Sequence, residues 1–371
     1  MRKLISGIVA ALLLAGCGGS AAPAPSGPAG SSAAVGSSGA AAQTSGAPTN
    51  PVDIAKYQGA DRQQILEAGA RKEGTVTWYT SIAGDAMDAL GNGFKQKYPF
   101  MQVNIFRADA IDLMTKANQE AQAGRQNFDL FEGNQLLVMA DAKLLTPFWS
   151  PALANVPDDL KMLPEGKLVM GASDWTTLIG FGYNTKLIPE NAVPKTQDDL
   201  LNPALKGKMS LAGSTTGSNW LGSILEAKGK DKGKEFLKRF AEQQPSVQQI
   251  SGKALQDLIA KGEVPASPTI FRDHVRQSKD QGAPIEWVPI EPVAALVTKV
   301  GVAAKAPHPH AAMLYLDYLL GDGQAVLKAH YYSSGTEKFP FKVWPIDAGK
   351  NSDQLQQQLQ DWTDLFKANF R

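Results

Sequence analysis

Two junctions between a predicted strand and a predicted helix carry clustered hydroxyl side chains. Residues 75–79 are rich in β-branched and aromatic side chains, as strands are, and apolar residues at helical spacing follow from Met87 to Phe94. The layout repeats at 208–224, where a Gly/Ser/Thr loop separates a short strand from a helix. Backbone N–H groups at a helix start lack partners within the helix and attract anions and hydrogen-bond acceptors. We therefore expect a ligand clamp with two sides. Its predicted contacts are Tyr79, Thr80 and Ser81 on one side, and Ser214, Thr215, Thr216 and Asn219 on the other.

Each stretch also fits an interpretation without a ligand. The first is compatible with an ordinary strand and helix in which a serine caps the helix, and the second with a flexible Gly/Ser loop. The second loop lacks the lysine of a nucleotide-binding P-loop, so we expect no NTP hydrolysis. It also carries Thr215 where a Gly-x-Ser-x-Gly hydrolase has its nucleophile, and the chain has only 4 histidines. The sequence therefore predicts a binding protein rather than an enzyme.

Three further polar residues stand near the ends of predicted strands. Asn134 follows a short buried strand at 128–131. Arg272 stands where an extended segment turns helical, and its guanidinium suits a carboxylate or phosphate. A surface salt bridge from Arg272 to Asp273 or another neighbour is nearly as good an interpretation. Glu291 precedes a buried strand and could bind an ammonium group, which would indicate a zwitterion.

Strand and helix patterns alternate along most of the chain. Strands at 75–79, 101–106 and 128–131, separated by helical segments, favour a parallel sheet whose carboxyl ends meet at one edge. Residues 168–184 alternate like a pair of strands, and 293–304 is apolar enough for a buried strand that crosses back. We therefore expect an α/β fold with two lobes and a ligand cleft between them.

The chain begins like a bacterial lipoprotein. A charged start at Arg2 and Lys3 precedes an apolar run at 4–14, which is too short to span a bilayer. The run ends in Leu-Ala-Gly-Cys, which resembles a lipobox, so we expect lipid attachment at Cys17. Because Cys17 is the only cysteine, an intramolecular disulfide and a cysteine-cluster metal site are excluded. Residues 18–50 are almost wholly Gly, Ser, Ala and Pro, and we expect a disordered tether there.

The charges of the chain nearly balance, since 37 basic and 36 acidic side chains give a net charge of +1. This balance gives no reason to expect nucleic acid or an anionic membrane surface as a partner. After the start, the sequence has no other apolar run long enough to cross a membrane. His308 and His310 stand at a helix entry without an obvious Cys or carboxylate partner, so we expect a solvent-facing capping pair rather than a metal site. We expect no metal and no cofactor.

A set of short motifs resembles the extracellular solute-binding proteins of bacterial ABC importers. The motifs are Gly74-Thr75-Val76 through Thr80-Ser81, Gly182-Tyr183-Asn184-Thr185, Leu205-Lys206-Gly207-Lys208, and Ala306-Pro307-His308-Pro309-His310-Ala311-Ala312 through Leu319-Leu320-Gly321-Asp322-Gly323-Gln324. The set spans residues 72–324 and is most similar to the ferric-iron and phosphonate-type subgroup. The resemblance implies a type II periplasmic-binding fold, in which two α/β lobes joined by strands close over a ligand and are recognised by a membrane permease.

The sequence departs from that subgroup at one position. Ferric members carry adjacent tyrosines where this chain has Ile270 and Phe271, so we do not expect iron. Tyr331 and Tyr332 follow the returning helix and are expected to pack. Arg272 with the hydroxyl loop favours a polar or anionic organic ligand such as a phosphonate, sugar phosphate or carboxylate. The alternatives are a ferric-iron-binding member of the same family and a tethered extracellular hydrolase or cell-wall-binding module.

We therefore predict a lipid-anchored, monomeric receptor outside the cytoplasmic membrane. It would deliver a small solute to an ABC permease and ATPase complex, without contact to nucleic acid. The predicted divisions are a signal peptide at 1–17, a tether at 18–50, a first lobe at 51–178 and 293–330, a second lobe at 179–292, and a C-terminal segment at 331–371 that packs across the lobes.

Overall fold

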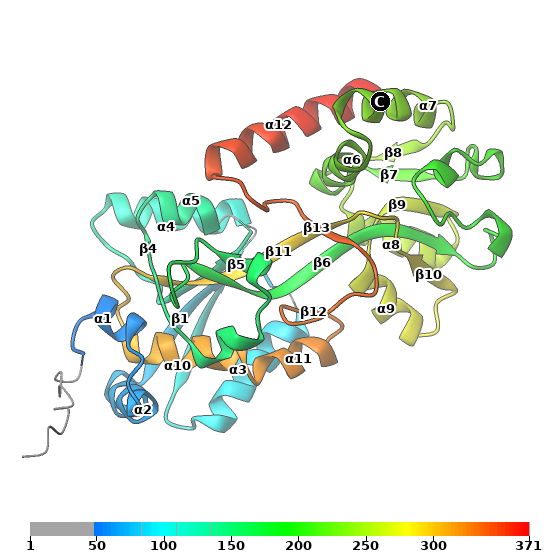
Figure 1. Ribbon diagram of the computed structural model, residues 1–371. Coiled ribbons are helices and arrows are strands. Elements are labelled where there is room, and N and C mark those ends of the chain that lie inside the picture. The colour runs from blue at the N-terminus through cyan, green and yellow to red at the C-terminus, as the bar shows by residue number, and fades with distance from the viewer. Residues whose placement is uncertain (1–47, 83, 109, 135, 371) are drawn as a thin grey trace, which may run out of the picture. The chain divides into compact units, whose positions relative to one another are not determined.

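The computed structural model describes residues 48–370, apart from 83, 109 and 135. The predicted signal peptide, the predicted lipid attachment at Cys17 and nearly all of the predicted tether lie outside these residues. In the described part of the chain, no helix is both long and apolar enough to cross a membrane. Helices and strands alternate along the chain, as the sequence pattern predicts for an α/β fold (Figure 1).

The first lobe is built on three parallel strands. β1 (Thr75–Thr80) lies between β2 (Gln102–Arg107) and β3 (Leu130–Gly133) and pairs in parallel with both, which confirms the expected parallel arrangement. Strand β11 (Val293–Ala303) then pairs antiparallel with β3, so the complete sheet is mixed. Among the described residues this sheet contains 11 strands, with the order β10-β6-β11-β3-β1-β2 at its centre.

Strand β6 (Gly171–Asn184) is one continuous strand of 14 residues, so the pair of strands expected at 168–184 is wrong. β6 pairs antiparallel with β11, and its second half also pairs with β9 (Ala266–Phe271) and β10 (Ile285–Val288). In Figure 1, β6 and β11 run side by side from the first lobe into the second. These two strands therefore connect the lobes.

The glycines in β6 do not form a turn. They leave space for large side chains of the neighbouring strands. A Cβ on Gly180 would lie 2.6 Å from Cε2 of Trp287, and one on Gly182 would lie 2.8 Å from Cγ2 of Ile270. Both distances are too short for a real contact, so these positions need glycine to bring the strands together. This close packing explains why a glycine-containing stretch continues as a strand.

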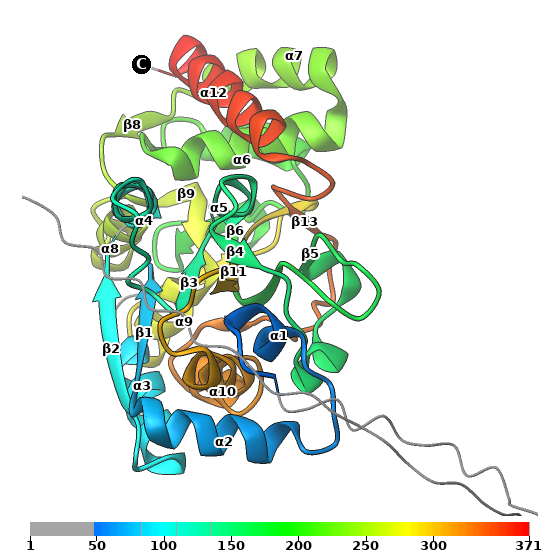
Figure 2. The same ribbon diagram turned by 90° about the vertical axis from the view of Figure 1, so that its left-hand side faces the viewer.

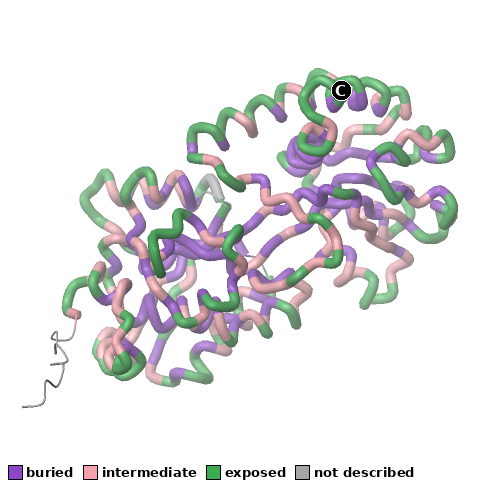
Figure 3. Tube along the Cα trace, viewed as in Figure 1, coloured by how far each residue is buried: buried purple, intermediate pink, exposed green. Residues whose placement is uncertain are grey.

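Helices cover both faces of the first lobe's sheet (Figures 1 and 2). One face carries α3 (Asp85–Lys97) and α10 (Pro309–Leu320), against which α1 (Pro51–Lys56), α2 (Arg62–Glu73) and α11 (Gly323–Ala329) pack. The other face carries α4 (Ala110–Gln122) and α5 (Leu136–Asp141). Aromatic rings join α10 to the sheet and to α3: the ring of Tyr315 lies 5.5 Å from that of Trp78 and 4.7 Å from that of Phe94. Figure 3 shows the buried residues concentrated along the strands between the helices.

The second lobe contains its own pair of parallel strands, β7 (Ser210–Ala212) and β8 (Ser246–Gln248), besides β9 and β10. Its helices are α6 (Thr215–Lys228), α7 (Lys230–Ala241), α8 (Gly252–Lys261) and α9 (Arg272–Asp280). These bounds confirm the strand, loop and helix expected at 208–224. Short 3₁₀ helices precede β7, namely η3 (Glu190–Ala192), η4 (Asp198–Leu201) and η5 (Pro203–Leu205).

The irregular connector expected at 144–164 contains only short elements. They are β4 (Leu145–Thr146), η1 (Pro151–Asn155), η2 (Asp158–Leu160) and β5 (Lys161–Met162). Each is two to five residues long, which agrees with the proline-rich, non-periodic sequence of this stretch.

The C-terminal segment contacts both lobes. β12 (Ser333–Ser334) pairs with β6, and β13 (Val343–Pro345) pairs in parallel with β11. Helix α12 (Ser352–Asn369) packs against α6 and α7, while the Ser352 hydroxyl at its start donates a hydrogen bond to Asp141 of α5. The helix therefore spans from the first lobe to the second.

Candidate functional site

The start of helix α6 is held in place by its own loop. Ser214 is the N-cap, and its Oγ accepts a hydrogen bond of 3.4 Å from the backbone N–H of Thr216. The N–H of Gly217 donates to the carbonyl oxygen of Ser214 at 3.1 Å. On the other side of the loop, Gly213 N–H donates to the Gln248 carbonyl oxygen on β8. These bonds fix the direction in which the first turn of α6 presents its side chains.

A cavity of about 530 Å³ lies beside this first turn. The first lobe contributes Asp112 of α4 and Asn134 after β3, and residues 295–297 of β11 form part of the wall. The remaining lining residues are Thr215, Ser218 and Asn219 of α6, and Ile346, Asp347, Leu355, Leu359 and Thr363 of the C-terminal segment. The volume falls within the range that small-molecule sites occupy. Apolar walls with a few polar groups are also typical of such sites.

Asn219 is the most unusual polar group of this cavity. It is only 4 % exposed, and its Oδ1 has no hydrogen-bond partner among the described residues. A buried amide oxygen without a donor costs free energy, because it has lost its water and gained no replacement. A ligand with an N–H or O–H group could supply the missing donor.

Lys299 lies on β11 close to the cavity, and its ammonium is already paired. It is 5 % exposed and forms an ion pair with Asp347, which lines the cavity. The pair is charge-neutral, so the charge that remains on the described cavity lining is that of Asp112.

Three of the predicted ligand contacts lie around the cavity. They are Asn134, Thr215 and Asn219. Ser214 and Thr216 lie directly beside it, but their side chains serve the helix start. Ser214 caps α6, and Thr216 is 5 % exposed, with its Oγ1 accepting a hydrogen bond of 3.3 Å from Ser214. Whether these residues contact a ligand stays a prediction.

Tyr79 and Thr80 are buried within the first lobe and do not line the cavity. The Tyr79 hydroxyl donates to Glu120 Oε1 at 2.8 Å, and burial together with this carboxylate raises the pKa of the Tyr79 phenol. Thr80 Oγ1 donates to Glu132 Oε2 at 2.8 Å and accepts from the backbone N–H of Ile82. Ser81 is half-buried at the end of β1. The ends of β1 and β3 therefore meet as expected, but through hydrogen bonds between their own side chains.

Two buried carboxyl groups lie behind this strand end. Glu132 is fully buried and also accepts a hydrogen bond of 3.0 Å from Trp175 Nε1. Burial raises the pKa of Glu132 to about 7, although the hydrogen bonds from Thr80 and Trp175 oppose this shift. Burial and then the nearby Glu132 charge raise the pKa of Asp174 well above its usual value. Asp174 stands where the pairing of β6 with β11 shifts register, so a β-bulge positions its side chain.

Arg272 and Glu291 lie away from the cavity. Arg272 Nη2 donates to Ser333 Oγ at 2.7 Å and to Glu337 Oε1 at 2.9 Å, and its Nε lies 3.6 Å from Asp273 Oδ1. This is the salt-bridge alternative given for Arg272 above, with a second carboxylate from the C-terminal segment. Glu291 is exposed in the loop before β11 and is absent from the described lining of the cavity.

The two histidines at the entry of α10 do have carboxylate partners, so the expectation that they lack them is wrong. His308 Nδ1 lies 2.9 Å from Asp129 Oδ2, and His310 Nδ1 lies 2.6 Å from Glu73 Oε1. The same carboxylates accept backbone N–H groups of residues 308, 310 and 311 at the helix start. Both rings are only partly exposed. Glu73 ends α2 and Asp129 directly precedes β3. The sequence pattern does not show that these residues lie next to the start of α10. Among the described residues no group of three or more His, Cys, Asp or Glu is placed to hold a metal ion.

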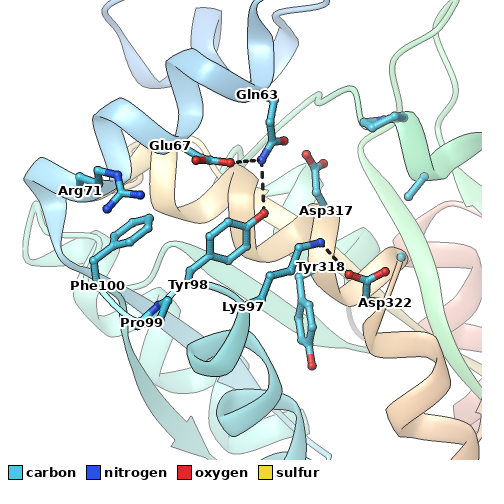
Figure 4. Close-up of a pocket in the computed structure, with 13 residues that line it drawn as sticks. Gln63, Glu67, Arg71, Lys97, Tyr98, Pro99, Phe100, Asp317, Tyr318 and Asp322 are labelled. Carbon is cyan, nitrogen blue, oxygen red and sulfur yellow. Dashed lines mark hydrogen bonds and ion pairs between the residues drawn. The ribbon is translucent and has the colours of Figure 1, made fainter.

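A larger hollow of about 960 Å³ lies on the outer side of the first lobe, between α2, the end of α3 and α10 (Figure 4). Its polar side chains mostly bind one another: Gln63 Nε2 donates to Glu67 at 2.8 Å and to the Tyr98 hydroxyl at 3.2 Å, and Lys97 pairs with Asp322 at 2.6 Å. Of the predicted site residues that the structure describes, none lines it. We therefore take the smaller cavity, which both lobes line, as the candidate site.

Sequence reasoning missed much of the cavity lining. Asp112 and Ser218 carried a usable signal, because each lies in the first or second turn of a helix that follows a strand end. Asp347, Leu355 and Leu359 carried none, since their place depends on how the C-terminal segment folds back over the lobes.

The family comparisons agree with this architecture. Residues 126–370 match the model of a family described as bacterial extracellular solute-binding protein. No curated protein matches the sequence.

Several solved structures share the fold. The fructose 6-phosphate-bound periplasmic binding protein AfuA from Actinobacillus pleuropneumoniae is 19 % identical, with a TM-score of 0.62, over 80 % of this chain and 99 % of AfuA. Iron-bound HitA from Pseudomonas aeruginosa is 18 % identical, with a TM-score of 0.61, over 78 % of this chain and 99 % of HitA. A putative extracellular solute-binding protein from Bordetella parapertussis is 16 % identical, with a TM-score of 0.65, over 81 % of this chain and 100 % of that protein. These likenesses confirm the expected two-lobed α/β fold.

Proposed function

The chain belongs to the family of bacterial extracellular solute-binding proteins, the substrate-binding components of ABC importers, and from this premise we propose where and how it binds its solute. A small polar organic solute enters the cavity beside the start of α6. Closure of the two lobes about β6 and β11 then encloses the solute for delivery to the membrane permease.

The observation that carries this proposal is the composition of the cavity wall. Asp112 and Asn134 come from the first lobe, and Thr215 and Asn219 come from the second. A solute that contacts both pairs would stabilise the closed arrangement of the lobes, because only that arrangement offers all its contacts at once. The unpartnered Oδ1 of Asn219 gives the solute a specific buried contact.

The similar structures support a binding role but do not select the solute. One holds a sugar phosphate and another holds iron. Ferric members of the subgroup carry adjacent tyrosines for iron, and no tyrosine is among the described lining residues of the cavity, which favours an organic solute. We include in the proposal that the protein performs no catalysis, as membership of a family of substrate-binding components implies.

The family places the protein in the cell envelope, and we propose that a lipid on Cys17 holds it there as a monomer. The sequence at 4–17 supports the lipid, and the Gly/Ser-rich stretch at 18–50 supports a tether that leaves the lobes free to reach the permease. The predicted lobe boundaries at 178/179 and 292/293 fall within β6 and at the start of β11, and we propose these two strands as the hinge.

The test is a thermal and chemical denaturation screen of the protein with a low-mass extract of the producing cells. A solute present at about a hundred times its dissociation constant adds about 2.7 kcal/mol to the free energy of unfolding. We expect Thr215→Trp to lose this gain, because the exposed Thr215 lines the cavity and an indole there would fill it. Gln357→Trp is the matched control, since Gln357 is exposed on α12 and is absent from the described lining. If no extract stabilises the wild type, or if Thr215→Trp binds as well as Gln357→Trp, the proposed site is wrong.

A further inference from the structure

The charge of the cavity indicates the chemical class of the solute. Asp112 and Asp347 line it, and among the described lining residues there is no Lys, Arg or His. Lys299 lies on β11, two residues beyond the lining residue Val297, and Asp347 neutralises it. Asp112, which stands exposed in the first turn of α4, forms no ion pair with another described residue, so it is the negative charge that remains on the described lining.

The hydrogen-bond groups of the cavity also favour a donor. Asn219 is 4 % exposed on the cavity wall, and its Oδ1 lacks a donor among the described residues. Asn134 offers a second amide, from the opposite lobe. A protonated amine has up to three N–H donors and no acceptor, so it can satisfy carboxylate and amide oxygens together.

An anion would find no charged donor among the described lining residues. At the start of α6, the backbone N–H groups of Thr216 and Gly217 already bond to Ser214, at 3.4 Å to its Oγ and 3.1 Å to its carbonyl oxygen. Arg272, which made the sequence favour an anion, is bound to Ser333 and Glu337 outside the cavity. An anion would also approach Asp112, and like charges repel.

The rest of the wall suits a hydrocarbon portion. Leu355 and Leu359 of α12 face the cavity, as do Leu296, Val297 and Ile346. No aromatic ring is among the described lining residues, so a quaternary ammonium would lack the aromatic faces that usually bind it. A primary or secondary amine, which donates hydrogen bonds, fits this wall better.

We propose that the solute is an organic amine in its protonated form, with its ammonium group between Asp112, Asn134 and Asn219 and its carbon skeleton against Leu355 and Leu359. This inference rests on the proposed function and specifies the substrate class of the same site. A carboxylate elsewhere on the same solute is compatible with it, provided that the ammonium makes the contact with Asp112.

The test separates the low-mass extract by charge before the denaturation screen. Loaded on a strong cation exchanger at about pH 1.5, amines and amino acids are retained, because their nitrogen is charged and their carboxyl groups are largely protonated this far below the carboxyl pKa. Phosphate esters and simple carboxylic acids pass through. We expect only the retained fraction to stabilise the wild type.

Two variants locate the contact. We expect Asp112→Asn to weaken binding of the retained fraction about tenfold or more, as loss of a hydrogen bond to a charged group does. Asp88→Asn is the control and should bind as the wild type does. Asp88 also lies in the first turn of a helix, α3, so both substitutions remove a carboxylate that interacts with a helix dipole. Asp88 differs from Asp112 in that it is absent from the described lining of the cavity.

Each outcome decides between the two proposals. Stabilisation by the unretained fraction alone, or an Asp112→Asn protein that binds like the wild type, would overturn the amine and leave the proposed solute-binding function in place. Stabilisation by neither fraction would overturn both.

Discussion

Removal of the Arg272 side chain should damage stability while leaving solute binding intact. The sequence made Arg272 the predicted anion contact, but the structure uses it to hold the C-terminal segment. Its Nη2 bonds to Ser333 at 2.7 Å and to Glu337 at 2.9 Å, and its guanidinium carbon lies 5.0 Å from the ring centroid of Phe339. Because Ser333 belongs to β12, which pairs with β6, Arg272→Ala would loosen the segment where it joins the sheet.

The size of the loss follows from the burial of the partners. The side chain of Arg272 is 12 % exposed and that of Glu337 is 29 % exposed, so the pair is neither fully buried nor freely solvated. Hydrogen bonds to charged groups contribute about 1.5–3 kcal/mol each, and solvent screening of Glu337 reduces its share. Truncation also leaves the carboxyl of Asp273, 6 % exposed, without its nearest cation. We therefore expect Arg272→Ala to lower the free energy of unfolding by about 2–3 kcal/mol.

Urea unfolding of Arg272→Ala beside Lys279→Ala measures this effect. Lys279 lies on the same helix, α9, and pairs with Glu286, but both side chains are at least 36 % exposed, so its loss should cost less than about 1 kcal/mol. The dissociation constant of whichever solute stabilises the wild type should stay the same in both variants. Normal stability with lost binding in Arg272→Ala would refute the structural role and return Arg272 to the ligand site.

The remaining predictions concern buried groups in the sheet and under α12. Burial raises the pKa of Glu132 from 4.5 to about 7, so the native state keeps a proton that the unfolded state releases, and stability should fall as pH rises through this interval. Glu132→Gln should flatten that fall in urea unfolding between about pH 5 and 8, whereas exposed Glu165→Gln should not, and an unchanged slope in Glu132→Gln would contradict the assignment. Trp362 is 6 % exposed and packs so closely on α6 that a Cβ on Gly222 would lie 2.6 Å from its indole, so Trp362→Ala should lower the free energy of unfolding by about 3–5 kcal/mol. A loss below about 1 kcal/mol would show that Trp362 does not hold α12 on α6.

The elements that the sequence predicted well are those with a local signal. The strand, loop and helix at 208–224 appear as β7 and α6, because β-branched residues, a serine N-cap and helical spacing act over a few residues. The three parallel strands of the first lobe were predictable for the same reason. β6 was not, because what keeps Gly180 and Gly182 in a straight strand is the bulk of Trp287 and Ile270, far along the chain.

The candidate site was predictable only in part, because long-range contacts decide which polar groups remain available. Asn134, Thr215 and Asn219 line the cavity, and all three follow a strand end that the pattern located. Glu132 and Asp174 gave no sequence signal of their altered pKa values, since burial by the assembled sheet is the main cause of both shifts.

The contrast between Arg272 and Asp112 shows what the sequence could not supply. Both are charged residues in the first turn of a helix, and by composition alone the arginine is the more obvious ligand contact. Glu337, 65 residues further along the chain, accepts a hydrogen bond from the guanidinium, which is therefore engaged outside the cavity. Asp112 meets no such partner among the described residues, and the C-terminal helix instead brings Leu355 and Leu359 to the same cavity. The sign of the charge offered to a solute is therefore set by the C-terminal segment, which both neutralises cations at Arg272 and Lys299 and completes the wall of the cavity.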